Sequence, residues 1–219
     1  MLAGAPGAWV RFVLRALQAW DRARLRRLER AHPGLQIHPS ASTNLAVARF
    51  ELAPGARLVI GPGVVAERLP GELCFQVADG AQLEVGAGTW LRCEVQKIRL
   101  VVYPGGVLQI GRDCWLNGCQ VSAKERVVIG EGAMIGPGTR VYDSDHALDD
   151  QRPEKSSPVH IGEFVWVASD VTITRGSFIG AHSVIGAKAL VNGRIEPHSL
   201  AYGIPAETRG AVGTRRAFM

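Results

Sequence analysis

The sequence predicts an all-β protein, a parallel β-helix with an amphipathic helix at its N-terminus. Two observations predict the β-helix, a six-residue aliphatic repeat and the Gly residues that follow many of its members. The repeat is clearest at nine positions: Ile129, Ile135, Val141, Ile161, Val167, Ile173, Ile179, Ile185 and Val191. A period of six is a multiple of the strand period of two and not of 3.6, so these residues share one face of extended segments. Hexapeptide repeats of this kind are typical of β-helix coils.

Residues 7–31 have the spacing of an amphipathic helix. Apolar side chains recur there at steps of three and four residues, namely Trp9, Phe12, Val13, Ala16, Trp20 and Ala23, and an opposite stripe is basic, namely Arg11, Arg15, Arg22 and Arg26. His32-Pro33-Gly34 ends the segment. The apolar side either packs on this protein or on a neighbouring subunit, or the helix lies on a membrane with its Arg side toward anionic lipid. Both interpretations stay open.

From Ile37 to about Leu116 the repeat is visible but irregular. Ile60-Gly61, Val85-Gly86 and Ile110-Gly111 recur at intervals of 25 residues, longer than three hexads, which predicts coils with wider corners. From Val127 to Val191 the hexads are regular. We therefore predict three parts: a basic helix in 1–34, a β-helix domain in 35–200, and a closing segment with a basic, mobile tail in 201–219.

One interruption breaks the regular coils. Val141 and Ile161 are 20 residues apart, two more than three hexads. The residues between them are polar and include Pro153 and Pro158, so they cannot continue the coil. We predict a loop that protrudes over 142–158, the kind of position where rigid scaffolds tend to carry binding and catalysis.

Charge and composition limit the classes of function. The 219 residues carry a formal net charge of +5. The first 31 residues hold seven Arg against Asp21 and Glu29, so the basic surplus belongs to that segment and no nucleic-acid-binding body is expected. No apolar run approaches the roughly 18 residues of a transmembrane helix, and Arg11 and Arg15 interrupt any signal-peptide-like stretch, so we expect a cytoplasmic protein.

The cysteines do not indicate a metal site. They show no CxxC pair and no zinc-type spacing with His, and we expect buried, reduced thiols at Cys74, Cys93, Cys114 and Cys119.

Three segments carry a resemblance to a known family: IGRDCWLNGCQVSAKERVVIGEGAMIGPGTRVYDSDH (110–146), PVHIGEFVWVASDVTI (158–173), and 179–206, which ends in YGIPA. They resemble the hexapeptide-repeat acyltransferases, and the nearest branch looks like the bacterial O-acetyltransferases of cell-surface sugars and polysaccharides. The resemblance covers 105–206 closely and 35–104 in fold only. It implies a left-handed β-helix, a homotrimer, and transfer of an acetyl group from acetyl-CoA to a hydroxyl or amine.

The same resemblance assigns a catalytic base in the predicted loop. A sugar hydroxyl is a weak nucleophile near neutral pH, so a base must take its proton as it attacks the thioester. His146 ends the Asp143-Ser144-Asp145-His146 run and matches the family's catalytic His, a residue type suited to this task. Asp143 or Asp145 would orient the ring and stabilise its charged form, or would simply form an Asx turn.

Two further residues are candidates for acceptor binding. Asn117 matches a position where sugar acetyltransferases often carry Asn, whose amide would bond a substrate hydroxyl or carbonyl; a structural Asn at a coil corner is the alternative. His160 precedes Ile161 and is expected to face outward near the loop.

The acetyl-CoA candidates also follow from the resemblance. Trp166 matches the Trp that lies along the pantetheine arm, and the backbone N–H of Ala168 or Ser169 matches the donor to the oxyanion. The phosphates of CoA need basic side chains, for which the candidates are Lys188, Arg194 and Arg209. Lys188 stands where relatives commonly have Gly, and Glu207 where they commonly have Lys.

These observations favour an acetyl-CoA-dependent O-acetyltransferase acting on a sugar hydroxyl in cell-surface polysaccharide or lipopolysaccharide biosynthesis, at the inner face of the membrane if the N-terminal helix binds lipid. Three alternatives stay open. One is N-acylation of an amino-sugar nucleotide by the same fold, and another is a non-catalytic β-helix scaffold. The third is a zinc enzyme of the carbonic anhydrase type, which would need His146, His160 and His182 to meet; no HxxxxH spacing occurs, and no metal is expected.

Overall fold

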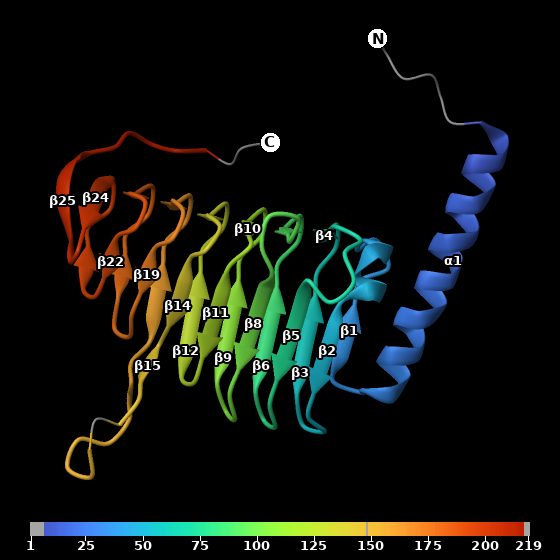
Figure 1. Cartoon of the computed structure of the whole chain (residues 1–219), viewed down its shortest axis with the longest axis horizontal. Coiled ribbons are helices and arrows are strands. Elements are labelled where there is room, and N and C mark those ends of the chain that lie inside the picture. The colour runs from blue at the N-terminus through green and yellow to red at the C-terminus, as the bar shows by residue number, and fades with distance from the viewer. Residues whose placement is uncertain (1–6, 148, 217–219) are drawn as a thin grey trace.

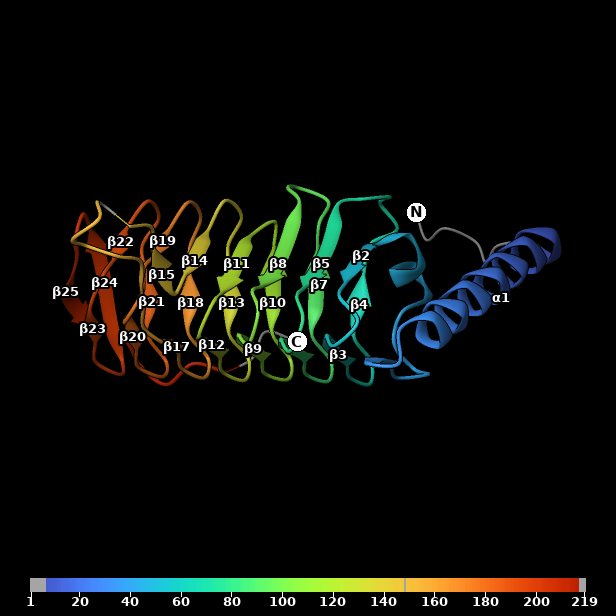
Figure 2. The ribbon, with the colours of Figure 1, turned by 90° about the horizontal axis from the view of Figure 1, so that it is seen from below.

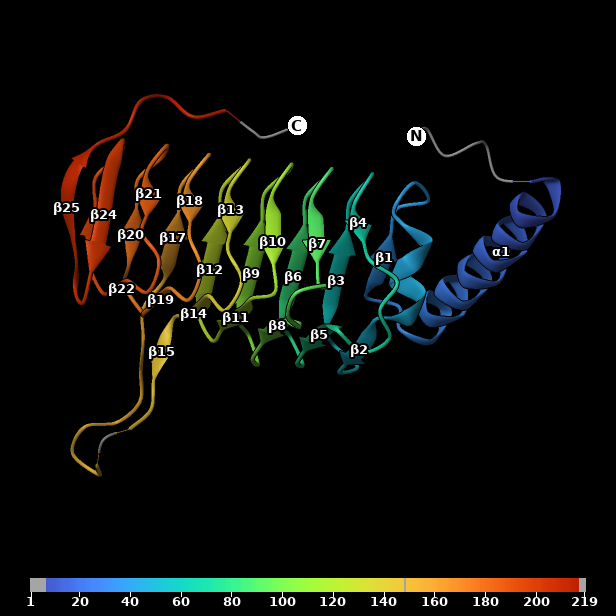
Figure 3. The same ribbon diagram turned by 45° about the horizontal axis from the view of Figure 1, so that its top comes forward.

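The computed structural model describes residues 7–147 and 149–216. The chain winds into an elongated left-handed parallel β-helix with an α-helix at one end, which confirms the predicted fold class (Figure 1). Three parallel sheets run the length of the solenoid and form its three faces (Figure 2). A polar loop projects from one side, and the chain's C-terminal segment runs back along another (Figures 1 and 3).

Each coil visits the three sheets in the same order, first sheet A, then C, then B. Sheet A contains β1 (Leu35–Ile37), β3 (Arg57–Ile60), β6 (Gln82–Val85), β9 (Val107–Ile110), β12 (Arg126–Ile129), β17 (Val159–Ile161), β20 (Phe178–Ile179) and β23 (Arg194–Ile195). Sheet B contains β2 (Arg49–Leu52), β5 (Leu73–Val77), β8 (Ile98–Val102), β11 (Gln120–Ala123), β14 (Arg140–Tyr142), β19 (Thr172–Ile173) and β22 (Leu190–Val191). Sheet C contains β4 (Val65–Ala66), β7 (Trp90–Arg92), β10 (Trp115–Asn117), β13 (Met134–Ile135), β18 (Trp166–Val167), β21 (Val184–Ile185), β24 (Ser199–Gly203) and β25 (Ala206–Ala211).

The hexad residues form the core, as predicted. All nine point inward and are at most 1% exposed. Parallel pairing stacks equivalent residues of successive coils, so Ile129 lies in register with Ile161 and Ile161 with Ile179. Burying each such side chain contributes about 1.5–3 kcal/mol, which is why six-residue steps specify the winding of the chain.

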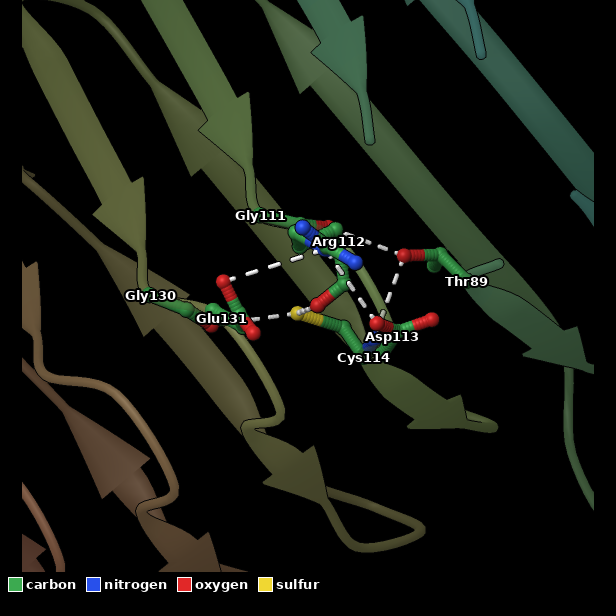
Figure 4. Close-up of polar contacts among 7 residues, drawn as sticks. All are labelled: Thr89, Gly111, Arg112, Asp113, Cys114, Gly130 and Glu131. Atoms are coloured by element: carbon green, nitrogen blue, oxygen red, sulfur yellow. Dashed lines mark hydrogen bonds and ion pairs between the residues drawn. The ribbon is translucent and has the colours of Figure 1, made fainter. Parts of the chain in front are cut away.

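Side-chain to backbone hydrogen bonds hold the corners between sheets A and C. Thr89 Oγ1 donates to Gly111 O at 2.9 Å and accepts from Cys114 N at 3.2 Å, and the Cys114 thiol donates to Gly130 O at 3.1 Å (Figure 4). All four cysteines are buried and unbridged, as expected.

The N-terminal helix α1 (Ala8–Ala31) touches the solenoid only through its C-terminal part. Asp21 and Leu25 are buried, Asp21 pairs with Arg68, and the Arg22 guanidinium donates to Ala41 O at 2.9 Å. Every residue from 8 to 20 is exposed, including Trp20 at 73%. Residues 8–20 of α1 therefore do not pack on their own chain, and one end of the helix extends away from the coils (Figure 1). None of the described helices has the length and hydropathy needed to span a bilayer.

The C-terminal end closes the solenoid and runs back along it. Ala201 is still fully buried and belongs to the row of sheet C, so the solenoid continues past residue 200 before β24 turns back into β25. The basic tail also contacts the coils, because Val212 N donates to His198 O at 2.6 Å. Near the N-terminus, a 3-10 helix, η1 (Thr43–Val47), occupies the place of the first strand of sheet C.

Candidate active site

The predicted loop leaves the solenoid after β14 and returns at β17. Its two sides form a short antiparallel hairpin, β15 (Ser144–Asp145) with β16 (Lys155–Ser156), which projects well beyond the coils (Figure 3). Ser157 N donates to Asp143 O at 2.8 Å and closes the base of the loop. The loop thus extends from the solenoid at the corner where the chain passes from sheet B to sheet A, and hydrogen bonds hold its two sides together.

Asp143 anchors this loop to the preceding coil. Its side chain is buried, with 1% of the residue exposed. One carboxylate oxygen accepts from Lys124 N and the other from Glu125 N and Arg126 N, each at 2.8 Å. Bonds from backbone N–H groups to a carboxylate are among the stronger hydrogen bonds in proteins. Asp143 therefore holds the turn at 124–126, and its carboxylate is directed into the solenoid rather than toward His146.

Asp145 and His146 lie farther out on the loop and are exposed. Asp145 forms an ion pair with Arg175 of a neighbouring corner, and Glu154, on the other side of the loop, pairs with Lys124 at 2.5 Å. Among the described residues none forms a hydrogen bond with the His146 ring. The imidazole of His146 is therefore exposed, without a ring contact in the described part of its own chain.

Asn117 ends strand β10 at the corner between sheets C and B. Its amide nitrogen donates to Ile135 O at 3.2 Å, and its Oδ1 is buried without a partner in the part of the chain that the structure describes. An unsatisfied buried oxygen costs roughly 1–3 kcal/mol. The amide therefore has the role of a structural Asn at a coil corner, and its Oδ1 lacks a donor among the described residues.

Four of the predicted cofactor residues lie at this corner between sheets C and B, in later coils than Asn117. Trp166 projects from sheet C and is 42% exposed. Ala168 N donates to Ile185 O at 2.9 Å, within the coil ladder, whereas Ser169 N has no acceptor among the described residues. Lys188 lies in the next coil, where its N–H donates to Ser169 O at 3.0 Å. Of the two predicted oxyanion donors, only Ser169 therefore has its N–H free.

Lys188 adopts a backbone conformation that favours glycine. Its φ is 61°, and Gly138 has φ 73° in the equivalent column two coils earlier. A non-Gly residue there is strained, and Lys188 adds a cation where Gly138 adds no side chain.

Arg215 is a candidate that sequence reasoning did not assign. Its guanidinium lies 5.4 Å from the ring centroid of Trp166, its Nε donates to Phe164 O at 3.1 Å, and its backbone N donates to His182 Nδ1 at 3.1 Å. Burial lowers the pKa of Arg215 from its ordinary value. The basic composition of the tail was visible in the sequence, but its path back to Trp166 was not. The tail thus adds a cation beside the Trp166 ring, on the side of the corner between sheets A and C.

Two predicted cofactor residues lie elsewhere. Arg194 faces outward from sheet A, with its guanidinium 4.1 Å from the Phe178 ring centroid and 2.6 Å from Glu196 Oε1. Arg209 is on β25 and pairs with Glu207 at 3.0 Å. Trp166 is on sheet C, so the structure does not bring Arg194 to the Trp166 corner.

His160 faces outward, as expected, and stacks on Phe178 at 5.1 Å between ring centroids. This contact covers one face of the imidazole, and the resulting burial lowers the pKa of His160. His182 instead stacks between Phe164 and His198 at a different corner. Within residues 7–147 and 149–216, no three His, Cys, Asp or Glu side chains cluster as a metal site would require.

The two halves of the predicted site lie at opposite ends of the sheet B strands, at the two corners of the solenoid that bound this face. Trp166 and Ser169 are at the corner where chain passes from sheet C into sheet B, and the loop with His146 departs where sheet B ends. The loop and the C-terminal tail that contacts Trp166 project from different sides of the solenoid (Figures 1 and 3). One chain by itself therefore presents both halves without joining them.

Known proteins match part of the chain. No protein-family model matches the chain. The galactoside O-acetyltransferase of Escherichia coli is 32% identical over 93 residues, which cover 41% of this chain and 46% of the relative. The putative lipopolysaccharide biosynthesis O-acetyl transferase WbbJ of Escherichia coli is 30% identical over 100 residues, 40% of this chain and 51% of the relative. The matches thus span about half or less of the length of these curated relatives.

Solved structures match over most of the chain. The polysialic acid O-acetyltransferase OatWY has a TM-score of 0.50 and 18% identity, covering 78% of this chain and 90% of its own. AntD, an N-acyltransferase from Bacillus cereus solved with dTDP-4-amino-4,6-dideoxyglucose and coenzyme A, has a TM-score of 0.51 and 17% identity, covering 86% and 89%. At these identities the likeness shows the fold alone. The chain is therefore a left-handed parallel β-helix whose sequence is similar to that of acetyltransferases over part of its length.

Proposed function

We propose that the protein is an acetyl-CoA-dependent O-acetyltransferase that acts on a sugar hydroxyl of a cell-surface polysaccharide or lipopolysaccharide precursor. The observation that carries this proposal is the corner of Trp166 and Ser169, where an exposed aromatic ring stands beside an unused backbone N–H. The local sequence similarity to a galactoside O-acetyltransferase supports a sugar as the acceptor.

The groups at this corner fit the needs of a bound thioester. Trp166 offers an apolar surface to the pantetheine arm, and Arg215 and Lys188 supply positive charge for the phosphates of the donor. Ser169 N–H would donate to the carbonyl oxygen as it gains negative charge, an interaction that is stronger in the transition state than in the ground state.

His146 completes the chemistry as the general base. The sugar hydroxyl oxygen attacks the thioester carbonyl carbon while His146 takes the hydroxyl proton. The tetrahedral intermediate then collapses, the carbon–sulfur bond breaks, and the departing thiolate receives the proton from the imidazolium. The products are the O-acetyl sugar and free CoA thiol.

The site is assembled between neighbouring subunits of a homotrimer. His146 projects from one edge of sheet B, and Trp166 and Ser169 stand at the other, so the loop of one subunit would reach the corner of the next. A cyclic trimer repeats this heterologous contact three times and closes. The exposed hairpin around His146, which has no partner for the ring within its own described chain, becomes useful only in such an arrangement.

We place the enzyme in the cytoplasm, at the inner face of the membrane. In α1 the residues 8–20 are wholly exposed and include Trp9, Phe12 and Trp20, whereas the following residues to Arg30 are rich in Arg. An apolar segment that enters the lipid surface, with Arg side chains near anionic headgroups, supports peripheral binding. This position would suit a lipid-linked acceptor.

The direct test is acetyl transfer with a panel of acceptors. The purified protein is incubated with acetyl-CoA and with galactosides or amino-sugar nucleotides, and the release of CoA thiol is followed together with the mass of the product. We expect wild type and His38→Ala, a change of a distant exposed His, to be equally active, and His146→Ala to lose activity by at least a hundredfold, the contribution typical of general-base catalysis.

The product separates the competing interpretations. An acetyl ester is removed by mild alkali, whereas an acetamide survives it, so an alkali-stable product would indicate N-acylation instead. Undiminished transfer by His146→Ala would overturn the assigned base. No transfer to any acceptor, with no binding of acetyl-CoA, would favour a scaffold.

A further inference from the structure

A column of stacked rings occupies the corner between sheets A and C in the last coils. Phe164, His182 and His198 stand at equivalent positions of three successive corners, with φ of 53°, 61° and 59°. The ring centroids are 5.3 Å apart for Phe164 and His182 and 4.9 Å apart for His182 and His198. In the coil before, the equivalent residue is Gly132, with φ 63°. Side chains are strained at such φ values, and strained residues that persist commonly have a function.

The C-terminal tail runs along this column. Val212, which follows β25, donates from its backbone N to His198 O at 2.6 Å. Three residues later, Arg215 donates from its backbone N to His182 Nδ1 and from its Nε to Phe164 O, each at 3.1 Å. The tail therefore contacts every ring residue of the column, and at His182 it contacts the ring itself.

The hydrogen bond at His182 requires an uncharged ring. Its Nδ1 accepts the N–H of Arg215, so this nitrogen carries a lone pair and the proton of the neutral ring is on Nε2. In a protonated ring Nδ1 would be a donor, and the bond to the tail would be lost. The positive ring would also face His198 in the stack and the cation of Arg215. Because imidazoles change charge between about pH 5 and 8, this contact responds to pH in the physiological range.

The other charged groups around the His182 ring do not offset this repulsion. Each neighbouring corner carries one carboxylate, Glu163 in the coil before and Glu196 in the coil after. Glu196 pairs with Arg194 at 2.6 Å, and within the described residues neither carboxylate forms an ion pair with His182. The tail contributes Arg216 as a further cation. Protonation of His182 therefore adds a positive charge without a carboxylate partner, which favours release of the tail.

The ring column connects the tail to the proposed donor site and is accessible in the proposed trimer. The Arg215 guanidinium lies 5.4 Å from the ring centroid of Trp166, so docking of the tail brings a cation beside this ring. The trimer joins the two corners at the ends of the sheet B strands, whereas the column is at the third corner, between sheets A and C. The tail and the β15–β16 hairpin also leave the solenoid on different sides (Figure 3). Movement of the tail therefore does not require the subunits to separate.

We propose that His182 is a pH-sensitive anchor for the C-terminal tail. The neutral ring holds Arg215 beside Trp166, and protonation releases the tail and takes this cation away from the acetyl donor. The proposal rests on the proposed function, because the regulated site is the proposed donor site. Strand β25 stays paired with β24 in both states, since its backbone hydrogen bonds do not involve His182, so only the residues after Ala211 move.

Two substitutions of His182 separate the hydrogen bond from the ring. His182→Asn places an amide oxygen near the position of Nδ1, where it accepts from Arg215 N at every pH, and Asn tolerates a positive φ. His182→Phe keeps an aromatic ring, which Phe164 shows to be compatible with this corner, but offers no acceptor. His38→Asn is the matched control, because its Nδ1 also accepts a backbone N–H, that of Ser40 at 3.1 Å, at an exposed site in the first coil.

Amide hydrogen exchange of the C-terminal peptide, corrected for the intrinsic effect of pH, measures docking of the tail. In wild type and His38→Asn we expect protection at pH 7.5 that falls at least fivefold at pH 5.5, about the effect of one lost hydrogen bond. Protection in His182→Asn should stay within about twofold over this range, and His182→Phe should show the low acidic level at both pH values. Constant protection in wild type or His38→Asn, an equal fall in His182→Asn, or full protection in His182→Phe at pH 7.5 would overturn the proposal.

Titration of the same four proteins with acetyl-CoA tests the connection to the donor site. The 3′-phosphate of the donor itself changes charge near about pH 6, so the affinity of each protein at pH 5.5 is compared with its own affinity at pH 7.5. Wild type should lose about threefold more affinity than His182→Asn, as expected for one exposed cation, and equal losses would refute the connection. No acetyl-CoA binding by any of the four proteins at pH 7.5 would contradict the proposed function, whereas the exchange data alone decide whether His182 anchors the tail.

Discussion

Asp143 shows how a residue within a catalytic-looking motif can serve the fold. The sequence presents Asp143 and Asp145 as equal partners for His146, and only the structure distinguishes a carboxylate buried on three backbone N–H groups from one exposed beside Arg175. Those three donors belong to a turn 17 to 19 residues earlier in the chain, a contact that local sequence spacing does not reveal.

Asp143→Ala should therefore destabilise the protein strongly. It leaves three backbone donors of the turn at 124–126 without their acceptor, and bonds of this kind contribute about 1.5–3 kcal/mol each in favourable cases. We expect the free energy of unfolding in urea to fall by about 3 kcal/mol. Asp145→Ala removes one exposed ion pair and should change it by less than about 1 kcal/mol. Equal effects would contradict the anchoring role.

His160 should make the stability of the protein depend on pH. Its pKa is lowered in the folded state by burial against Phe178, so between the folded pKa and the ordinary value of about 6.5 the unfolded chain binds more protons. Stability from this group is complete above pH 6.5 and falls as the pH drops from there to the folded pKa.

His160→Gln should abolish this part of the pH dependence. Urea unfolding at several pH values between 5 and 8 provides the measurement, and the variant's profile should be flatter than that of wild type in the acidic half. His38→Gln, at an exposed site, serves as the control. Parallel profiles for wild type and His160→Gln would show that the stacked ring is not the source.

At the scale of elements, the hexad strands were predictable and the corners and tail were not. Inward residues at steps of six interact with their equivalents one coil away, so the winding follows from local spacing, as Ile161 on Ile179 illustrates. The path of the tail depends on Arg215 meeting Phe164, 51 residues away, which no periodic pattern encodes. Successive hexads belong to sheets A, C and B in turn, and assigning the hexads in this order from the sequence would have shown that Trp166 and Arg194 are on different faces.

The exposed part of α1 should determine membrane binding. Trp9→Ser with Trp20→Ser removes two side chains that are 75% and 73% exposed and whose burial in lipid would each contribute up to about 1.5–3 kcal/mol. We expect at least a tenfold loss of binding in sedimentation with phosphatidylglycerol vesicles. Val95→Ser, an exposed apolar residue of the solenoid, should have no effect. Failure of wild type to bind the vesicles at low salt would refute the membrane role.

At the scale of the whole molecule, the proposed function makes assembly part of the mechanism, because the two halves of the proposed site lie at opposite ends of the sheet B strands. The sequence indicated each half through the resemblance, as residues around His146 and around Trp166, but not that one chain keeps them apart. That separation follows from the sheet order, since a strand of sheet B lies between the corner and the loop.

Mixed subunits should therefore recover activity. His146→Ala and Trp166→Ala are each expected to be inactive alone, yet a trimer containing both has an interface where an intact His146 meets an intact Trp166. Equal mixing on refolding should restore about a quarter of wild-type transfer, by random pairing of subunits. No recovery from properly mixed trimers would indicate that both residues act within one chain.

The central claim is that this β-helix binds acetyl-CoA at the Trp166 corner and uses His146 for chemistry. Isothermal titration of wild type and His146→Ala with acetyl-CoA and with free CoA tests it most directly. We predict micromolar binding that is the same in both proteins, with acetyl transfer lost only in the variant. No binding of either ligand by wild type would contradict the claim, because the protein would then not bind the acetyl donor.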